Sequence, residues 1–346
     1  MISARPNTAT PIPDGRVGIR ESRRRRLLLA FGSALVAPGL VVAQTASAIP
    51  RIGLLWIAGD NSGEYILSLR EGLRDAGYVV GRNIAIDDRF LVSDYAQLPE
   101  AARRLVAEGV ALIVTYGATA TVQASKATTT VPIVVVAGGD PVKLGVAASL
   151  SRPGGNVTGL TVISQDLSGK RLELLKEIAP GMRRVAVVLF PESTAEVSSL
   201  RDFEAAARTL NLEVRPVEVR TLQEIEPAIS NIGALGVQGI AVVGSSLFSA
   251  NRKRLLTAIN RLRLPAIYGS GEFPMVGGLL AYSADLSEHS RRVAGHIDKI
   301  LKGANPGDIP IEQPTKIELV VNKTTASALG IRIPASILAR ADRVIE

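Results

Sequence analysis

Short hydroxyl-bearing and acidic side chains follow the apolar runs of this chain and are its best candidates for binding chemistry. A helix N-terminus offers unpaired N–H groups and a partial positive charge, so the turn at residues 117–119 can hold a carboxylate without a Lys or Arg. Asp140 or Glu272 can then receive an ammonium group, which makes a site of zwitterion size. The candidate solute-binding residues are Asp60, Thr115, Gly117, Ala118, Thr119, Asp140, Ser193, Ser245, Ser246 and Glu272.

Each of these residues also has a structural interpretation. Asp60, Thr119 and Ser193 are of types that cap helices. Aromatic residues near predicted strand ends either stack on an apolar solute or pack in the core; they are Trp56, Tyr116, Phe190, Tyr268 and Tyr282. The recurrence of polar segments after six strands, in two halves of the chain, favours a binding site.

Motifs of catalysis and metal binding are missing from the sequence. The chain has no Cys, which excludes disulfides, thiolate metal sites, a Cys nucleophile and a lipid-modified N-terminal Cys. Its two His residues, His289 and His296, lie about 10.5 Å apart along one predicted helix, too far to share one metal ion. Gly-x-Ser-x-Gly, P-loop and Gly-x-Gly-x-x-Gly patterns do not occur. We therefore predict no catalytic residue, no metal and no cofactor.

The elements that must position the candidates alternate between short β-rich runs and amphipathic helices. Several runs are apolar throughout, as in strands that are covered on both faces of a parallel sheet. Helices are expected at residues 64–76, 167–178 and 286–301. This alternation predicts an α/β fold with right-handed crossovers. Strands are expected at residues 51–57, 83–90, 111–116, 132–137, 157–163, 184–190, 213–219, 239–244, 265–268 and 278–282.

Three interruptions of this alternation lie near residues 153–156, 273–278 and 310–316. A chain of this length exceeds what one hydrophobic core usually serves. Two lobes joined by several crossing strands explain the interruptions best. Ordinary loops within one large sheet are the alternative.

The first 48 residues have the pattern of a secretory signal peptide. The arginine run at residues 23–26 precedes an apolar stretch that ends near Ala46-Ser47-Ala48. Gly32, Pro38 and Gly39 interrupt that stretch, which argues against a membrane anchor. We expect cleavage near Ala48 and a periplasmic protein, exported by the general or the twin-arginine route.

Most of the net positive charge belongs to this leader. The formal net charge of +8 falls to +3 when residues 1–48, with seven Arg and two acidic residues, are set aside. No cluster of Lys and Arg follows Arg51, so the charge pattern excludes nucleic acid as a partner.

Five motifs resemble those of ABC transporter substrate-binding proteins of the tryptophan/tyrosine-binding group. The resemblance covers residues 51–346 in the same order. It implies a type I periplasmic-binding-protein fold with two Rossmann-like doubly wound lobes, three crossovers and a ligand cleft. The motifs are residues 153–159 (PGGNVTG), 170–175 (KRLELL), 277–282 (GGLLAY), 299–303 (KILKG) and 313–322 (QPTKIELVVN), the last followed by ALG at 328–330.

The resemblance also implies lobe boundaries and a cleft lining. Lobe 1 is residues 49–160 plus 277–310, and lobe 2 is residues 161–276 plus 311–346. Residues 115–119 and 139–141 would line the cleft from lobe 1, facing Ser245, Ser246 and Glu272 from lobe 2. Tyr282-Ser283 and the loop after Gly244 depart from the pattern of relatives. These departures argue against an aromatic amino acid and leave the solute open.

The sequence is therefore identified as an exported solute receptor of an ABC importer. It is expected to be a monomer that closes by a hinge motion around a small, amino-acid-like molecule and delivers it to a permease with its ATPase. A sensor for a chemoreceptor or histidine kinase is the main alternative. A doubly wound hydrolase and the effector lobes of a transcription regulator are weaker ones, because a nucleophile motif and a DNA-binding headpiece are missing.

Overall fold

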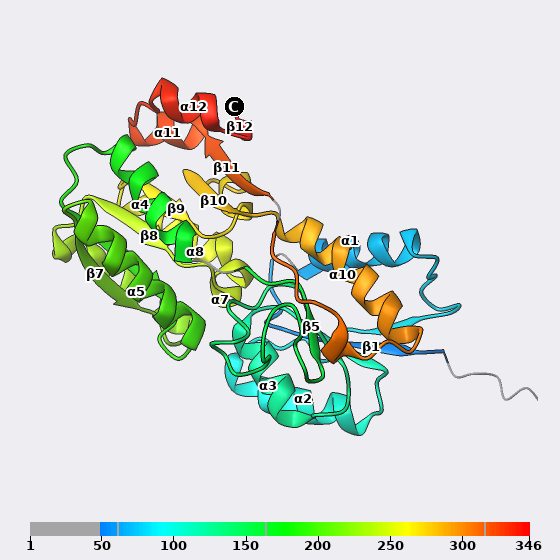
Figure 1. The fold of residues 1–346 in the computed structure, drawn as a ribbon. Helices are drawn as coiled ribbons and strands as arrows, with labels where there is room; N and C mark the ends of the chain where they lie inside the picture. Colours follow the sequence, from blue (N-terminus) through cyan, green and yellow to red (C-terminus); the bar gives the residue numbers. More distant parts are fainter. Residues whose placement is uncertain (1–48, 61, 163–164, 315) are drawn as a thin grey trace, which may run out of the picture. The chain divides into compact units, whose positions relative to one another are not determined.

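Two sheets form the framework of this computed structural model, which describes residues 49–60, 62–162, 165–314 and 316–346 (Figure 1). The predicted signal peptide at residues 1–48 lies outside the described residues. The first sheet has the order β2-β1-β3-β4-β5 and is parallel throughout. Its strands are β1 (Arg51–Leu55), β2 (Ala85–Asp87), β3 (Leu112–Thr115), β4 (Ile133–Val135) and β5 (Val157–Gly159).

The second sheet has the order β12-β11-β10-β9-β8-β6-β7, and only its β10–β11 pair is antiparallel. Reading from β7 to β10, it repeats the strand order of the first sheet. The α/β, doubly wound prediction is confirmed, and a strand overlaps every expected run. Its strands are β6 (Arg184–Leu189), β7 (Glu213–Glu218), β8 (Gly239–Val242), β9 (Ala266–Tyr268), β10 (Leu280–Ala284), β11 (Ile317–Asn322) and β12 (Arg343–Ile345).

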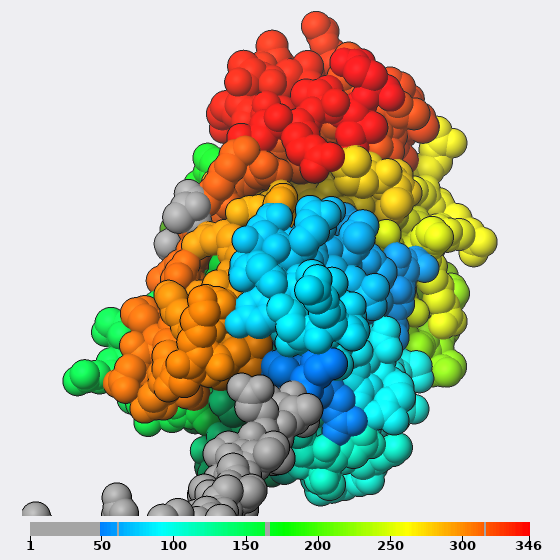
Figure 2. Space-filling view, turned by 90° about the vertical axis from the view of Figure 1, so that its right-hand side faces the viewer, coloured from blue at the N-terminus to red at the C-terminus, as the bar shows by residue number. Residues whose placement is uncertain are grey.

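Helices cover both faces of the first sheet, and we call this sheet with its helices the first half. On one face, α1 (Ser62–Asp75) and α10 (Leu286–Leu301) bury Leu69, Leu73 and Ile297 against the strands. Figures 1 and 2 both show α1, in blue, beside α10, in orange. On the other face lie α2 (Leu98–Ala107) and α3 (Ala118–Ala127). The helix α10 thus returns to the first half from far along the chain.

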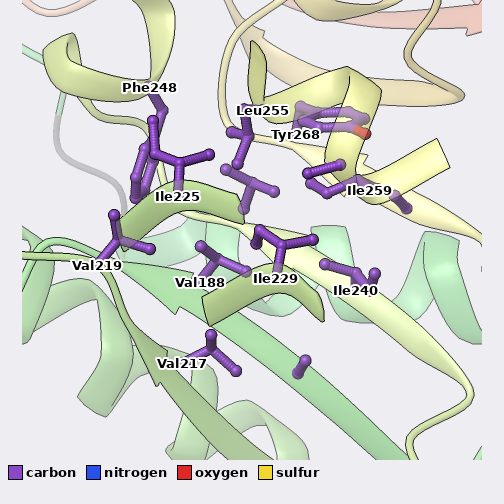
Figure 3. Packing of buried hydrophobic residues seen from close by; sticks show 14 of the residues in the cluster. Val188, Val217, Val219, Ile225, Ile229, Ile240, Phe248, Leu255, Ile259 and Tyr268 are labelled. Atoms are coloured by element: carbon purple, nitrogen blue, oxygen red, sulfur yellow. The ribbon is translucent and has the colours of Figure 1, made fainter. Parts of the chain in front are cut away.

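The seven-stranded sheet with its helices forms the second half, which has a core on each face. Along β6, Val185 and Val187 face one core, whereas Ala186 and Val188 face the other, which is why the strand is apolar throughout. Figure 3 shows the core in which Val188 and Ile240 of the sheet meet Ile229. The helices on that face are α6 (Ile225–Asn231) and α8 (Arg252–Arg261), and on the opposite face α4 (Gln165–Ile178) and α5 (Thr194–Thr209).

Shorter elements complete the chain. None of the helices in the described residues combines the length and the apolar character needed to cross a membrane. The short helices are α7 (Ser246–Ala250), α9 (Glu272–Met275), α11 (Lys323–Leu329) and α12 (Ala335–Arg340), with 3-10 turns η1 (Tyr95–Gln97), η2 (Leu222–Glu224), η3 (Ile232–Leu235) and η4 (Pro306–Asp308).

The chain passes between the two halves three times: between β5 and α4, between β10 and α10, and between η4 and β11. The second passage differs from the expectation that residues 277–310 all belong to the first lobe. The strand β10 pairs with β9 and β11, so residues 280–284 lie in the second half. Asp285 then caps α10 by accepting hydrogen bonds from Ser287 N (3.0 Å) and Glu288 N (3.1 Å). The sequence break at residues 273–278 is instead α9 and the turn that follows it.

Candidate ligand-binding site

A cavity of about 110 Å³ lies where the carboxyl ends of strands from both halves meet. We call it the central cavity. Parallel, doubly wound sheets bind ligands at this edge, because the loops that leave the strands converge there. The first half contributes the ends of β3 and β4, and the second half contributes the ends of β8, β9 and β10 together with α4 and α5. Its polar lining includes Thr119, Arg171, Ser193, Glu196, Ser245 and Ser246.

The turn between β3 and α3 supplies main-chain donors from the first half. Gly117 adopts a φ of 90° as the N-cap of α3, a conformation that disfavours other residues, and no side chain caps this helix. A Cβ at Gly117 would lie 2.9 Å from the Ser246 Oγ of the second half, so the position also needs a small residue. Ala118 and Thr119 begin the helix at the cavity wall. This turn is a favourable place for an anionic group.

Arg171 supplies a positive charge from the second half. It lies on α4, its side chain is only 2% exposed, and it lines the central cavity. Its Nε donates a hydrogen bond to Tyr282 O at 2.9 Å, and within the described residues no carboxylate forms an ion pair with it. Burial lowers the pKa of Arg171 to about 10, which still leaves it charged at neutral pH. A buried cation without a counter-ion is costly, so a ligand carboxylate would stabilise Arg171 strongly.

Glu196 supplies an acidic group from the same half. It lies in the first turn of α5, is 4% exposed and lines the central cavity. Its Oε2 accepts a hydrogen bond from Phe190 N at 2.8 Å. Burial raises the pKa of Glu196 to about 8, although the Phe190 amide and the Ser245 hydroxyl oppose that shift. Arg171 and Glu196 do not form an ion pair with each other.

Two tyrosines form aromatic walls of the cavity. Tyr95 comes from the first half, but its ring stacks on Phe190 of the second half with centroids 4.5 Å apart. Its hydroxyl shares a hydrogen bond with Ser246 Oγ (2.8 Å) and accepts one from Leu247 N (3.2 Å). The ring of Tyr116 stacks on the ring of Tyr65 in α1, with centroids 4.7 Å apart. An apolar or aromatic part of a ligand can pack against these rings.

The structure brings six of the ten predicted site residues to the central cavity. Their polar side chains and main-chain groups come from the loops that directly follow strands, as the sequence argument required. They are Gly117, Ala118, Thr119, Ser193, Ser245 and Ser246. Ser193 also has the structural role foreseen for it, since it caps α5 and accepts a hydrogen bond from Glu196 N at 3.4 Å.

The other four predicted residues lie outside this cavity, because their side chains are engaged elsewhere. Thr115 is fully buried and shares a hydrogen bond with Thr121 Oγ1 at 2.9 Å. Asp140 accepts hydrogen bonds from Val142 N (3.0 Å) and Lys143 N (3.2 Å), and lines a neighbouring cavity of about 370 Å³.

Asp60 and Glu272 both make contacts that join the two halves. Asp60 N donates to Ala250 O at 3.0 Å, and its carboxylate lies 3.9 Å from Lys253 Nζ. Glu272 forms an ion pair with Arg252 at 2.6 Å and accepts a hydrogen bond from Tyr65 Oη at 3.1 Å. The structure thus engages both groups expected to receive an ammonium, Asp140 and Glu272, away from the central cavity.

Sequence reasoning missed Arg171, Glu196 and Tyr95. The first two lie inside helices, whereas the sequence pattern places candidates in the loops that follow strands. A signal was nevertheless present, because each occupies the buried stripe of its helix. Glu196 stands three residues before Ser199 and seven before Phe203, which are both buried. A charged residue at an apolar position of a helix is therefore the feature to look for.

The remaining chemical candidates have structural roles. His289 Nδ1 lies 3.1 Å from Val136 O, and His296 Nε2 lies 3.3 Å from Pro310 O; burial lowers the pKa of both. Trp56 and Tyr268 belong to the cores. The described residues contain no group of three or more acidic and His side chains that could hold a metal ion.

Comparison with known proteins gives one consistent result. A family model described as ABC transporter substrate binding protein matches residues 54–345. A tyrosine-binding protein of Clostridioides difficile (strain R20291) is 28% identical over 267 residues, which are 76% of this chain and 75% of that protein.

Solved structures resemble the described fold closely. A crystal structure from Streptococcus pneumoniae of an ABC domain in complex with L-Trp has a TM-score of 0.79 and 25% identity, covering 86% of this chain and 99% of that one. A conserved domain protein from Vibrio cholerae has a TM-score of 0.80, also at 25% identity and with the same coverage.

Proposed function

The chain belongs to the family of ABC transporter substrate-binding proteins, and from this premise we propose that it binds a free amino acid in the central cavity and presents it to a membrane permease. It is a solute-binding receptor of an ABC importer, a family defined by binding and not by catalysis. We further propose that it is exported to the periplasm after cleavage near Ala48, and that its partner is a permease driven by an ATPase.

One observation carries the choice of an amino acid: the central cavity is lined by a buried cation and a buried acid that do not pair with each other, Arg171 and Glu196. A zwitterion brings an opposite charge to each. The volume of about 110 Å³ lies below the roughly 300–1,000 Å³ of pockets that hold drug-sized ligands, which favours a small solute such as one amino acid over a peptide. Relatives whose names specify tyrosine or L-Trp support the same class.

Capture follows from a site that is shared between the halves. A solute between α3 of the first half and Arg171 of the second gains its full set of contacts only when the halves are closed on it. It therefore shifts the population toward the closed form. We propose that residues 49–160 with 286–311 and residues 161–284 with 317–346 are the lobes that move, and that the permease distinguishes the closed form from the open one.

A thermal-shift screen of the purified protein against the common L-amino acids tests this function. A solute at 100 times its dissociation constant adds about 2.7 kcal/mol to the free energy of unfolding, a shift that is readily measured. The variant Arg171→Gln should lose most of this stabilisation for any amino acid that binds, because the solute carboxylate loses its charged partner. A screen in which no amino acid raises the melting temperature of the wild-type protein would contradict the proposal.

A further inference from the structure

We propose that Glu196 is the group that receives the ammonium of the solute and thereby makes this receptor select amino acids over the matching carboxylic acids. This inference rests on the proposed function and names a specificity-determining residue within it. The sequence argument had assigned that role to Asp140 or Glu272, both of which are engaged outside the central cavity.

Position and surroundings support the assignment. Glu196 is an acidic residue that is only 4% exposed and that lines the central cavity. One of its oxygens accepts from Phe190 N at 2.8 Å, and no cation among the described residues forms an ion pair with it. An ammonium group delivered by a solute would satisfy a buried carboxylate that the protein itself leaves without a counter-ion.

The other ionisable groups of the central cavity leave the recognition of an ammonium group to Glu196. Among the residues that the structure describes, the ionisable groups that line the central cavity are Tyr95 from η1, Tyr116 after β3, Arg171 from α4 and Glu196 itself. Arg171 suits a carboxylate, and both tyrosine hydroxyls are neutral at physiological pH, a state that burial favours further by raising their pKa. Glu196 is therefore the group in this cavity that can accept from an ammonium with charge assistance.

Burial also predicts a proton release. The raised pKa of Glu196, about 8, means that its carboxyl carries a proton in much of the population at pH 7. An arriving ammonium favours the ionised carboxylate, so the carboxyl proton passes to solvent while the ammonium keeps all three of its own. Solutes without an ammonium leave this proton in place.

The competing interpretation is purely structural. Glu196 is the third residue of α5, and Ser193 caps that helix, so the glutamate can serve only to hold the loop through Phe190 N. The substitution Glu196→Gln separates the two roles. A Gln side-chain oxygen still accepts from Phe190 N and keeps the volume of the residue, whereas the negative charge is lost.

Calorimetric titration of the full protein is the test, with L-tyrosine and L-tryptophan as probes beside 3-(4-hydroxyphenyl)propanoate and 3-(indol-3-yl)propanoate, which lack the amino group. We expect Glu196→Gln to weaken amino acid binding by about 30-fold or more, as for removal of one member of a buried charge pair. Binding of the two propanoates should stay within about threefold of the wild type or improve. The control is Glu192→Gln, which removes an exposed charge from the neighbouring cavity.

A second measurement follows the proton. Titrations at pH 7 in buffers of different ionisation enthalpy should show proton release for the amino acids in the wild type, and none in Glu196→Gln. Equal losses of affinity for amino acids and propanoates would show a structural role and overturn the inference. So would unchanged discrimination in Glu196→Gln. If the wild-type protein binds neither these probes nor any other amino acid but binds solutes of another class, the amino acid assignment itself fails, and this inference fails with it.

Discussion

Arg171 and Glu196 are placed where a hydrophobic side chain would pack well, on the buried stripes of α4 and α5. Burying a charge without a partner costs free energy, and hydrophobic residues of similar volume would remove that cost. A protein that retains both charges beside one cavity gains something other than stability from them. The central cavity thus combines complementary charges with main-chain donors, and the effect of each group on solute binding can be measured separately.

The main-chain donors of α3 can be tested with a pair of substitutions at one position. Thr119→Pro removes an N–H at the second residue of the helix, where the proline ring is compatible with the helical backbone. We expect the affinity for the solute to fall by about tenfold or more, equivalent to about 1.4 kcal/mol. Thr119→Ala keeps the N–H and removes only the hydroxyl, so it controls for side-chain loss. Equal affinities of the two variants in calorimetry would mean that the N–H does not bind the solute.

The pH dependence of stability should carry the signature of Glu196. Its pKa is raised from 4.5 in the unfolded chain to about 8 in the folded protein. Between these values the folded protein holds a proton that the unfolded chain has lost, so stability decreases as the pH rises.

Between pH 5.5 and 7.5, without solute, the free energy of unfolding of the wild type should fall by about 2 kcal/mol relative to Glu196→Gln. Urea unfolding at both pH values measures this difference. The pKa values of His289 and His296 are lowered by burial and add a dependence of their own, but the comparison with the variant removes it. If the free energy of unfolding changes with pH in the same way in both proteins, the pKa of Glu196 is not raised in the folded protein.

At the scale of elements, patterns in the sequence predicted the strands and the loops after them but not the interiors of the helices. Apolar runs bounded by Gly, Pro and polar residues mark buried strands because both faces of each strand are covered. The exceptions are β11 and β12, for which no strand was predicted, although Ile317–Asn322 lies within one of the five motifs that resemble the family. The prediction that β10 belongs to the first lobe was wrong, because a strand pattern does not identify which sheet the strand joins. Tyr95 was missed because its role depends on contacts between distant elements.

The 3-10 turn that contains Tyr95 connects the halves in a way that can be tested. Tyr95→Phe keeps the ring on Phe190 but removes the hydroxyl that bonds to Ser246 and to Leu247 N. We expect about 5- to 30-fold weaker binding, mostly through faster dissociation, because the closed form loses about 1 to 2 kcal/mol.

Tyr78→Phe is the matched control for this loss. Its hydroxyl donates to Asp298 Oδ1 at 3.0 Å, and both residues lie in the first half. It should leave the dissociation rate unchanged. Stopped-flow measurement of dissociation distinguishes the two variants, and the same rate in both would remove Tyr95 from any role in closure.

At the scale of the whole described chain, the two halves repeat one strand order, β2-β1-β3-β4-β5 and β7-β6-β8-β9-β10. Each half therefore presents the loops at its carboxyl edge to the same central cavity. The repetition also explains why polar segments recur after strands in both parts of the sequence. Three passages of the chain connect the halves, and contacts such as Asp60 N to Ala250 O lie between them. A receptor built this way can close without changing the fold of either half.

A substitution that opposes closure should therefore weaken binding without unfolding the protein. Gly59 lies so close to the second half that a Cβ there would be 2.1 Å from Ala250 O and 2.4 Å from Ala250 Cα. Gly59→Ala forces the halves apart at this point, and we expect about tenfold or greater loss of affinity, since the ligand must then bind a form that is less populated.

Gly63→Ala is the control, because a Cβ at Gly63, in the same region of the first half, meets no atom within 4 Å. Small-angle scattering should show a smaller solute-induced contraction for Gly59→Ala than for Gly63→Ala, while the melting temperatures without solute stay similar. If Gly59→Ala binds solute and contracts like its control, the contact at Ala250 does not belong to the closed form that holds the solute, and the proposed closure of the two lobes must be changed.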